Sequence, residues 1–166
     1  MRHKHYLFLP ALLAWAILFI VLSEPLRSQT KHVSMENLSK TADIVAVGKV
    51  TGTKSEWDQN KTRIFTLVTL QVSEYVKGGE GNSLTITTPG GEVGDVGELY
   101  THVPTFRPNE EVVVFLEKEA PGRYRVAGGD QGKYNIEKDP QTGRLVVAGS
   151  HRLEDFTAAV KKAMQN

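Results

Sequence analysis

The sequence predicts a mainly β protein: a small antiparallel barrel with a short helix before it and an amphipathic helix after it. Residues 63–76, RIFTLVTLQVSEYV, alternate apolar and polar side chains with the period of two that marks a half-buried strand. At fourteen residues this strand is far longer than the usual ~5–6. Several shorter apolar or alternating runs are separated by glycine and proline turns. A strand of that length is useful only if it serves two sheets or wraps around a small closed barrel.

The N-terminal residues predict export. Residues 1–5 carry two basic residues and residues 6–22 are an apolar run of seventeen, the pattern of a signal peptide. Val21 and Ser23 fit the −3 and −1 positions of a cleavage site, so we predict a signal peptide over residues 1–23 and a polar tether over residues 24–33. A run of seventeen also reaches the lower end of the ~17–25 residues that span a bilayer. An uncleaved signal anchor therefore stays open, with membrane contact only through residues 6–22.

A β-barrel domain is expected over residues 34–149. Ser34 is the expected N-cap of a helix over residues 35–40. Strands are expected at residues 43–50, 63–76, 83–88, 112–116, 123–127 and 133–138, with a short one at 145–148. Gly48 suggests a bend or bulge in the first strand. Residues 51–61 are expected to be a hairpin connection, and residues 89–111 a long loop whose glycines and prolines forbid regular structure over most of its length.

The last part of the chain, residues 151–166, is expected to be one amphipathic helix. Leu153, Phe156, Val160 and Met164 recur there at spacings of three and four, which places them on one face of a helix. That face is expected to pack onto the barrel or onto a partner.

Composition excludes several classes of site. The chain has no cysteine, which excludes disulfides, thiolate zinc sites and cysteine nucleophiles and favours a bacterial exported protein. Residues 1–23 contain Arg2 and Lys4 and no acids, so the rest of the chain holds 18 basic and 19 acidic residues, a net charge of −1. A near-neutral body has no electrostatic footprint for a nucleic-acid backbone. Binding of single-stranded nucleic acid is therefore disfavoured, and export disfavours it further.

Two short motifs carry a resemblance to a known family. The first strand begins with Ala42-Asp43-Ile44-Val45, and the long second strand ends with Val76-Lys77-Gly78. Over residues 38–129 this arrangement resembles the five-stranded OB barrel of netrin-like modules and tissue inhibitors of metalloproteinases. The resemblance implies an OB-like, netrin-like scaffold with protein-binding loops. Those animal inhibitors block the zinc of their target through an N-terminal cysteine, and because this chain has no cysteine, none of its residues inherits that role.

Three side chains are the candidate binding residues: Trp57 in the first hairpin, and Tyr100 and Arg107 in the long loop. Aromatic and arginine side chains on exposed loops are typical interface anchors. The alternative for Tyr100 and Phe106 is that they only pin the loop over the end of the barrel, and this is the interpretation we favour for Phe106.

The same loop leaves one catalytic alternative open. Glu92, Asp95, Glu98 and His102 lie close together in sequence, so a metal-assisted hydrolase is conceivable. A solvated acidic loop is the simpler interpretation, because zinc takes three or four ligands, commonly in close pairs. The glycine-rich residues 90–95 follow a strand but no helix follows them, so they do not match a phosphate-binding loop. We predict no catalytic residue, no bound metal and no cofactor.

These observations together predict a non-enzymatic, exported protein-binding module. Its expected place is the periplasm, the extracellular space or the membrane surface, and its expected partner is another exported or envelope protein. An inhibitor or accessory of an exported protease is one form of this function, and a structural envelope protein is an alternative to it.

Overall fold

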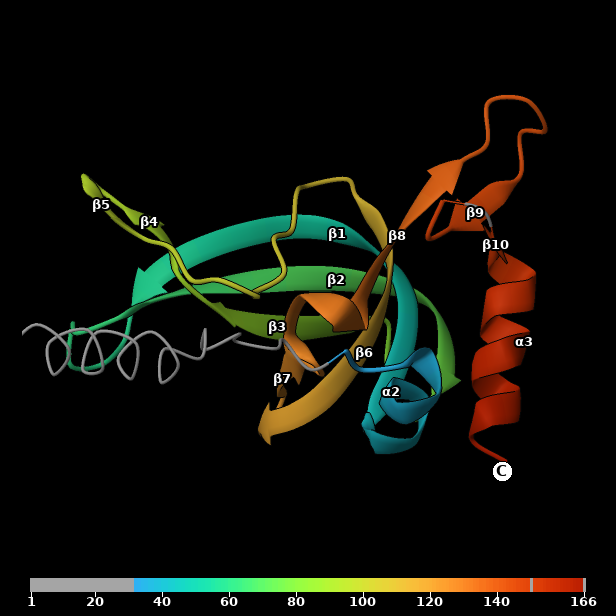
Figure 1. The fold of residues 1–166 in the computed structure, drawn as a ribbon. Helices are drawn as coiled ribbons and strands as arrows, with labels where there is room; N and C mark the ends of the chain where they lie inside the picture. Colours follow the sequence, from blue (N-terminus) through green and yellow to red (C-terminus); the bar gives the residue numbers. More distant parts are fainter. Residues whose placement is uncertain (1–31, 150, 166) are drawn as a thin grey trace, which may run out of the picture. The chain divides into compact units, whose positions relative to one another are not determined.

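The computed structural model describes residues 32–149 and 151–165, and every structural statement below refers to these residues. The elements in chain order are α2 (Met35–Thr41), β1 (Ile44–Trp57), β2 (Ile64–Lys77), β3 (Ser83–Pro89), β4 (Gly91–Val93), β5 (Val96–Glu98), β6 (Glu111–Ala120), β7 (Arg123–Val126), the 3-10 turn η1 (Gly129–Gly132), β8 (Lys133–Lys138), β9 (Leu145–Val147), β10 (His151–Arg152) and α3 (Leu153–Ala163). The domain is mainly β, as predicted, with a short helix towards each end (Figure 1). In this part of the chain no helix is long and apolar enough to cross a membrane.

The predicted signal segment, residues 1–23, and residues 24–31 of the predicted tether lie outside the described residues, so both stay predictions. The last two tether residues contact the domain: the backbone N–H of Val33 donates to Gln131 Oε1 at 2.8 Å, and His32 Nδ1 lies 3.1 Å from the same oxygen.

The main sheet partly closes on itself because its first strand, β1, pairs with β6 as well as with β2. β1 pairs antiparallel with β2 along most of its length, and residues 44–49 also pair antiparallel with β6. β2 pairs with β3, β3 pairs in parallel with β7, and β7 pairs with β6. The strands β8, β9 and β10 continue the sheet from β6. The pairing of β3 with β7 spans only two residue pairs, so this is the weakest seam of the ring.

Two apolar cores lie on opposite faces of the wall formed by β1 and β6. In β6, Val113 and Phe115 face one core while Val112, Val114 and Leu116 face the other, and all five are 0% exposed. Successive side chains of a strand point to opposite faces, so a wall between two cores requires a continuous apolar run. The prediction that residues 112–116 are buried on both faces is confirmed.

One core lies between this wall and the layer of α2, β8 and α3. The ring of Phe115 makes edge contacts with Tyr134 and Phe156 at centroid distances of 5.8 and 6.5 Å. Burial raises the pKa of Tyr134. The predicted C-terminal helix is confirmed, with Phe156 and Val160 buried in this core.

The two motifs that resemble the netrin-like family meet in space. Lys77, at the end of β2, donates from Nζ to the carbonyl oxygens of Ser39 at 2.9 Å and Lys40 at 3.0 Å, in the last turn of α2. A lysine there satisfies helix carbonyls that have no partner in the helix. Gly78 has φ +56°, and a Cβ atom at this position would lie 2.5 Å from the carbonyl oxygen of Asp43. The Ala-Asp and Lys-Gly pairs therefore form one junction between α2, β1 and β2.

One expectation is wrong in extent. Residues 51–57, expected in a hairpin connection, continue β1 and pair with β2, which confines the turn to residues 58–63. Most side chains on this arm are exposed or half-buried, so no apolar alternation marks it as a strand. Residues 89–111 are irregular over most of their length, as expected, and contain the short hairpin of β4 and β5. The bend expected at Gly48 is confirmed by a register shift between Val47 and Gly48.

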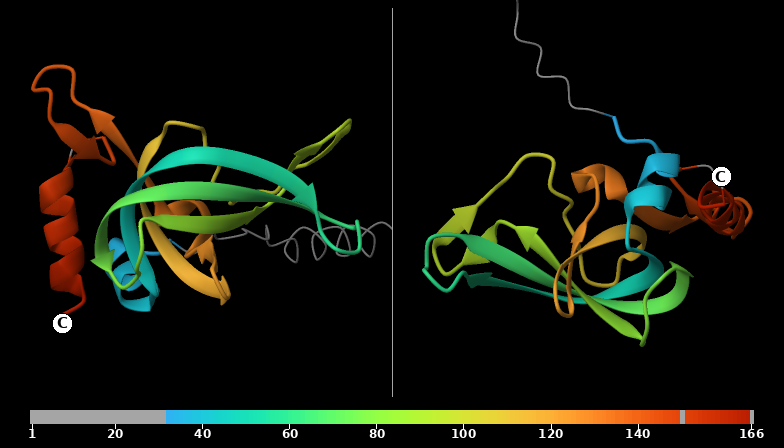
Figure 2. Two further views of the ribbon diagram at one scale, coloured as in Figure 1. Left: turned by 180° about the vertical axis from the view of Figure 1, so that it is seen from behind. Right: turned by 90° about the horizontal axis from the view of Figure 1, so that it is seen from below.

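The β4–β5 hairpin and α3 lie at opposite ends of the β1–β2 ribbon. Figure 1 shows the hairpin beside the turn between β1 and β2, and α3 beside the other end, and the reverse view of Figure 2 agrees. Lys161 of α3 pairs with Glu74 of β2 at 3.0 Å, which places α3 near the end of β2 that lies away from the hairpin.

Candidate functional site

The candidate site is the hairpin face, which we define as residues 90–106: β4, β5, the turn between them and the residues on either side. Three hydrogen bonds fix it to the start of β2. The N–H of Gly90 donates to the carbonyl oxygen of Ile64 at 2.8 Å, and the hydroxyl of Thr66 donates to the carbonyl oxygen of Gly90 at 2.7 Å. The carboxylate of Glu98 accepts from the N–H of Ile64 at 3.1 Å. Both backbone groups of Ile64 are thus bonded to the hairpin, which holds it on the rigid β1–β2 ribbon.

Gly91 allows the hairpin to cross this ribbon closely. A Cβ atom at Gly91 would collide with the hydroxyl oxygens of Ser55 and Thr66, which lie 3.0 Å from each other and share a hydrogen bond. Its φ of +133° is also one that other residues rarely adopt. Gly91 in the segment after β3 therefore has a structural explanation, the close approach of its backbone to the side chains of Ser55 and Thr66.

Tyr100 is held in place and still partly exposed. Its hydroxyl donates to Glu98 Oε2 at 3.0 Å, and this bond raises the pKa of Tyr100. Glu98 therefore accepts hydrogen bonds from both Ile64 and Tyr100. Tyr100 is 37% exposed, so it presents an aromatic side chain, held by its hydroxyl, to solvent.

A hollow of about 380 Å³ lies between the end of β3, the hairpin and the loop that follows it. Its lining includes Pro89, Glu92, Leu99, Tyr100, Pro104 and Phe106. Four large apolar residues are exposed in the described part of the chain, and three of them, Val96, Leu99 and Tyr100, lie on the hairpin face. Leu99 is 95% exposed. Apolar side chains gathered at one exposed place are more informative than isolated ones, because such patches mark interaction surfaces.

The structure does not bring the three predicted binding residues into one site. Tyr100 lines the hollow. Trp57 is the last residue of β1, half-buried and paired with Ile64 across the ribbon. Arg107 is exposed outside the lining of the hollow, and its N–H donates to Glu110 Oε2 at 3.0 Å. Sequence reasoning missed Val96 and Leu99; the available signal was two apolar residues beside acidic ones in a segment without periodicity.

Phe106 pins the loop, as expected. Its side chain packs against the core that is enclosed by β1, β2, β3, β7 and β6. Lys133 Nζ lies 5.0 Å from the centroid of the Phe106 ring. Lys133 also pairs with Glu110 Oε1 at 2.7 Å, with only 9% and 17% of the two side chains exposed. This largely buried pair ties the end of the loop to the first residue of β8.

The acidic residues of the loop do not gather into a metal site. The described residues contain no group of three or more His, Asp or Glu side chains that could hold a metal ion. Glu98 is engaged by Ile64 and Tyr100, and His102 Nδ1 lies 3.8 Å from Asp130 Oδ2. The geometry gives no support to a metal-assisted hydrolase.

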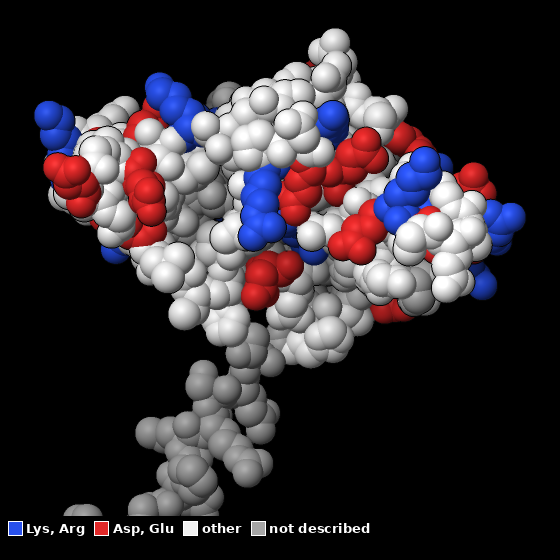
Figure 3. All heavy atoms as spheres, turned by 90° about the horizontal axis from the view of Figure 1, so that it is seen from above, with Lys and Arg blue, Asp and Glu red and all other residues white. Residues whose placement is uncertain are grey.

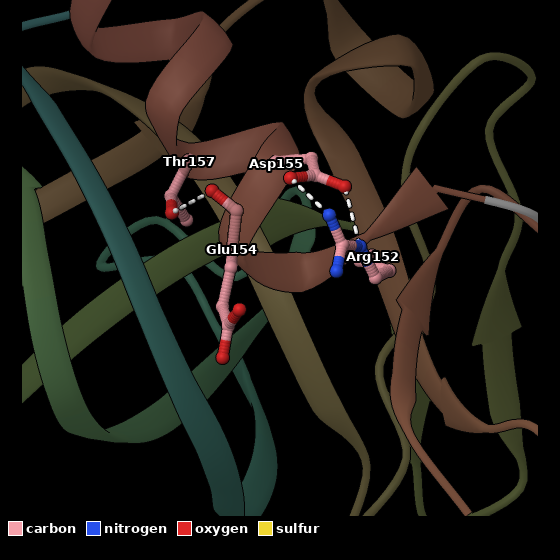
Figure 4. A network of polar contacts seen from close by, with 4 residues as sticks. All are labelled: Arg152, Glu154, Asp155 and Thr157. Atoms are coloured by element: carbon pink, nitrogen blue, oxygen red, sulfur yellow. Dashed lines mark hydrogen bonds and ion pairs between the residues drawn. The ribbon is translucent and has the colours of Figure 1, made fainter. Parts of the chain in front are cut away.

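A second hollow, of about 330 Å³, lies at the start of α3 and includes Arg144, Arg152 and Glu154 in its lining. Figure 4 shows the guanidinium of Arg152 forked onto the carboxylate of Asp155, with distances of 2.6 and 3.0 Å. This pairing raises the pKa of Arg152. Asp155 already balances the charge of Arg152, so we regard this hollow as a weaker candidate than the hairpin face.

No family model matches the chain, and no curated protein matches it.

Proposed function

We propose that this chain is an exported, non-enzymatic protein-binding module that uses the hairpin face to bind its partner. The observation that carries the proposal is Leu99, which is 95% exposed beside Tyr100 and an apolar-lined hollow. The hairpin that presents it is anchored to β2 by three hydrogen bonds. These bonds fix the backbone beside Leu99, so less backbone freedom is lost when a partner covers this side chain. Tyr100 is of a residue type that is enriched among binding hot spots.

The scaffold that we propose is an OB-type barrel of the netrin-like kind. Five strands support it, in the order β1, β2, β3, β7 and β6, with β6 paired back to β1. The single parallel seam, between β3 and β7, and the junction of the Ala-Asp and Lys-Gly motifs support it further. In OB-type barrels the loops between strands commonly bind the ligand, and the hairpin face lies in such a connection.

A protein partner fits this surface better than a nucleic acid. Figure 3 shows acidic and basic side chains interspersed over the face seen from above, without a continuous basic stripe among the side chains drawn in colour. The hairpin itself carries Glu92, Asp95 and Glu98 and no basic residue, which would repel a phosphate backbone. Together with the predicted export, this favours another exported or envelope protein, an exported protease among them.

Affinity capture with matched variants tests the proposal. The full chain, in a mild detergent, serves as bait for envelope and secreted proteins of the native organism. We expect Leu99→Ser to abolish capture of the dominant partner, and Tyr100→Ala to weaken it, without a change in the thermal midpoint. Leu145→Ser is the control, because Leu145 is also exposed, at 43%, but lies on β9. Trp57→Ala and Arg107→Ala show whether the surface extends beyond the hollow. Equal capture by wild type and Leu99→Ser would refute the assignment of the hairpin face.

A further inference from the structure

The charge of the hairpin face is one-sided. Residues 78–106 contain Glu80, Glu92, Asp95 and Glu98 and not a single lysine or arginine. Glu92 and Asp95 are exposed on the hairpin. Neither carboxylate has a hydrogen bond or an ion pair with another described residue. Two unpaired carboxylates therefore lie near the exposed apolar side chains of Val96 and Leu99.

The acidic residues differ in what they do. Glu98 is structural, since it accepts from the N–H of Ile64 and the hydroxyl of Tyr100. Glu92 lines the hollow, and Asp95 lies in the two-residue turn between β4 and β5. Arg63, just before β2, acts electrostatically on Tyr100, but it forms no ion pair with Glu92 or Asp95. The free negative charge is thus at the tip and along the wall of the hollow.

We propose that the hairpin face recognises an extended segment of its protein partner in which a large apolar residue is flanked by lysine or arginine. This inference rests on the proposed function and specifies its ligand. The apolar side chain would occupy the hollow against Leu99, Tyr100 and Phe106. The flanking cations would face Glu92 and Asp95, which have no counter-charge of their own. A hollow of about 380 Å³ lies within the range of ~300–1,000 Å³ typical of binding pockets.

The same charges argue against a lipid surface as the occupant. An exposed leucine, valine and tyrosine on a hairpin tip are side chains that also insert into membranes. Bacterial and cytoplasmic-leaflet membranes are anionic, however, and unpaired Glu92 and Asp95 would be repelled from them. Electrostatic complementarity therefore selects a basic protein segment.

Selection from a phage-displayed library of random twelve-residue peptides tests this inference. The bait is the full chain in a mild detergent, and Leu99→Ser is the reference bait. We expect peptides enriched on the wild type to carry Lys or Arg next to a large apolar residue. A synthetic copy of an enriched peptide should bind the double variant Glu92→Gln, Asp95→Asn about threefold to tenfold more weakly, because exposed ion pairs contribute modestly. Raised salt should weaken binding to the wild type and leave binding to the neutralised variant nearly unchanged.

The charge-reversed variant Glu92→Lys, Asp95→Lys gives the sharpest result. We expect it to enrich peptides with Asp or Glu at the flanking positions. If wild type and neutralised variant bind one peptide equally, and both lose it with Leu99→Ser, apolar contact alone carries binding; the charge inference then fails while the proposed function stands. If no peptide is enriched over the reference bait, recognition of an extended segment is overturned, and the capture experiment still decides the proposed function. Binding to phosphatidylglycerol vesicles that Leu99→Ser abolishes would overturn the inference in favour of a membrane.

Discussion

The wall of β6 and the hairpin of β4 and β5 use the same kinds of side chain in opposite ways. Residues 112–116 are all 0% exposed and fill two cores. On the hairpin face Val96 is 48% and Leu99 95% exposed. The wall is held by apolar contact, whereas the hairpin is held by hydrogen bonds to Ile64 and by the close approach of Gly91. A hairpin fixed by polar bonds does not need its apolar side chains for folding, so they can remain exposed.

The largest contrast is expected between Phe115→Ala and Leu99→Ala. Phe115 is fully buried between Tyr134 and Phe156, so truncation leaves a cavity and should lower the free energy of unfolding by about 3–5 kcal/mol. Leu99→Ala removes no buried contact and should change it by less than about 0.5 kcal/mol. Urea unfolding of the two variants and the wild type measures both values. A loss of several kcal/mol in Leu99→Ala would show that the hairpin face belongs to the folding core.

Two glycines of β1 sharpen the contrast within one strand. A Cβ atom at Gly48 would collide with the carbonyl oxygen of Gln71 and lie 3.0 Å from the Cγ atom of Leu70. Gly48→Ala should therefore lower the free energy of unfolding by about 1–3 kcal/mol, as overpacking does. A Cβ atom at Gly52 meets nothing within 4 Å, so Gly52→Ala should be neutral or stabilise by up to about 1 kcal/mol. Equal denaturation midpoints for the two variants would contradict this assignment of the bend to Gly48.

The sequence predicted the wall better than the hairpin for a physical reason. A strand that is buried on two faces has an unbroken apolar run in its sequence, here VVVFL. A strand with one buried face, such as β2, has alternating apolar and polar residues. The sequences of residues 51–57 and of the three-residue strands β4 and β5 show neither pattern, since solvent reaches most of their side chains. The residue before Leu99, Glu98, accepts a hydrogen bond from the N–H of Ile64, 34 positions away in the sequence. No local sequence pattern contains that bond. The residue type alone makes Tyr100 a candidate, whereas the same analysis does not select Leu99.

Lys133 links the two regions, and its removal is expected to affect both. Lys133→Met leaves the carboxylate of Glu110 without its cation at a site where only 9% and 17% of the two side chains are exposed. The free energy of unfolding should fall by about 1–3 kcal/mol, and partner capture should weaken because residues 106–110 lose an anchor. Lys54→Met is the control. Lys54 is 76% exposed in its pair with Glu56, and such pairs contribute about 0–1 kcal/mol. Chemical denaturation and capture with both variants measure the difference.

The smallest effect is expected in acid, at the turn between β1 and β2. Asp58 accepts hydrogen bonds from the hydroxyl of Thr62 at 2.8 Å and from the N–H groups of Thr62 at 2.6 Å and Arg63 at 3.2 Å. The Thr62 hydroxyl is the main cause that lowers the pKa of Asp58 below its ordinary value of 3.8. The carboxylate thus stays charged to lower pH in the folded than in the unfolded chain. Its contribution is complete above about pH 4 and is lost as the pH falls through the folded-state pKa.

Asp58→Asn should therefore lose less stability than the wild type between about pH 4 and pH 2, because the amide has no proton to gain. Urea titrations at a series of pH values measure the two slopes. Asp139, in the turn between β8 and β9, also has a lowered pKa, chiefly because it accepts from the N–H of Gln141. Asp139→Asn should act with the same sign, and the two effects should add, since the turns share no bonded residue. Parallel curves for wild type and Asp58→Asn would mean that this turn keeps its geometry without the charge.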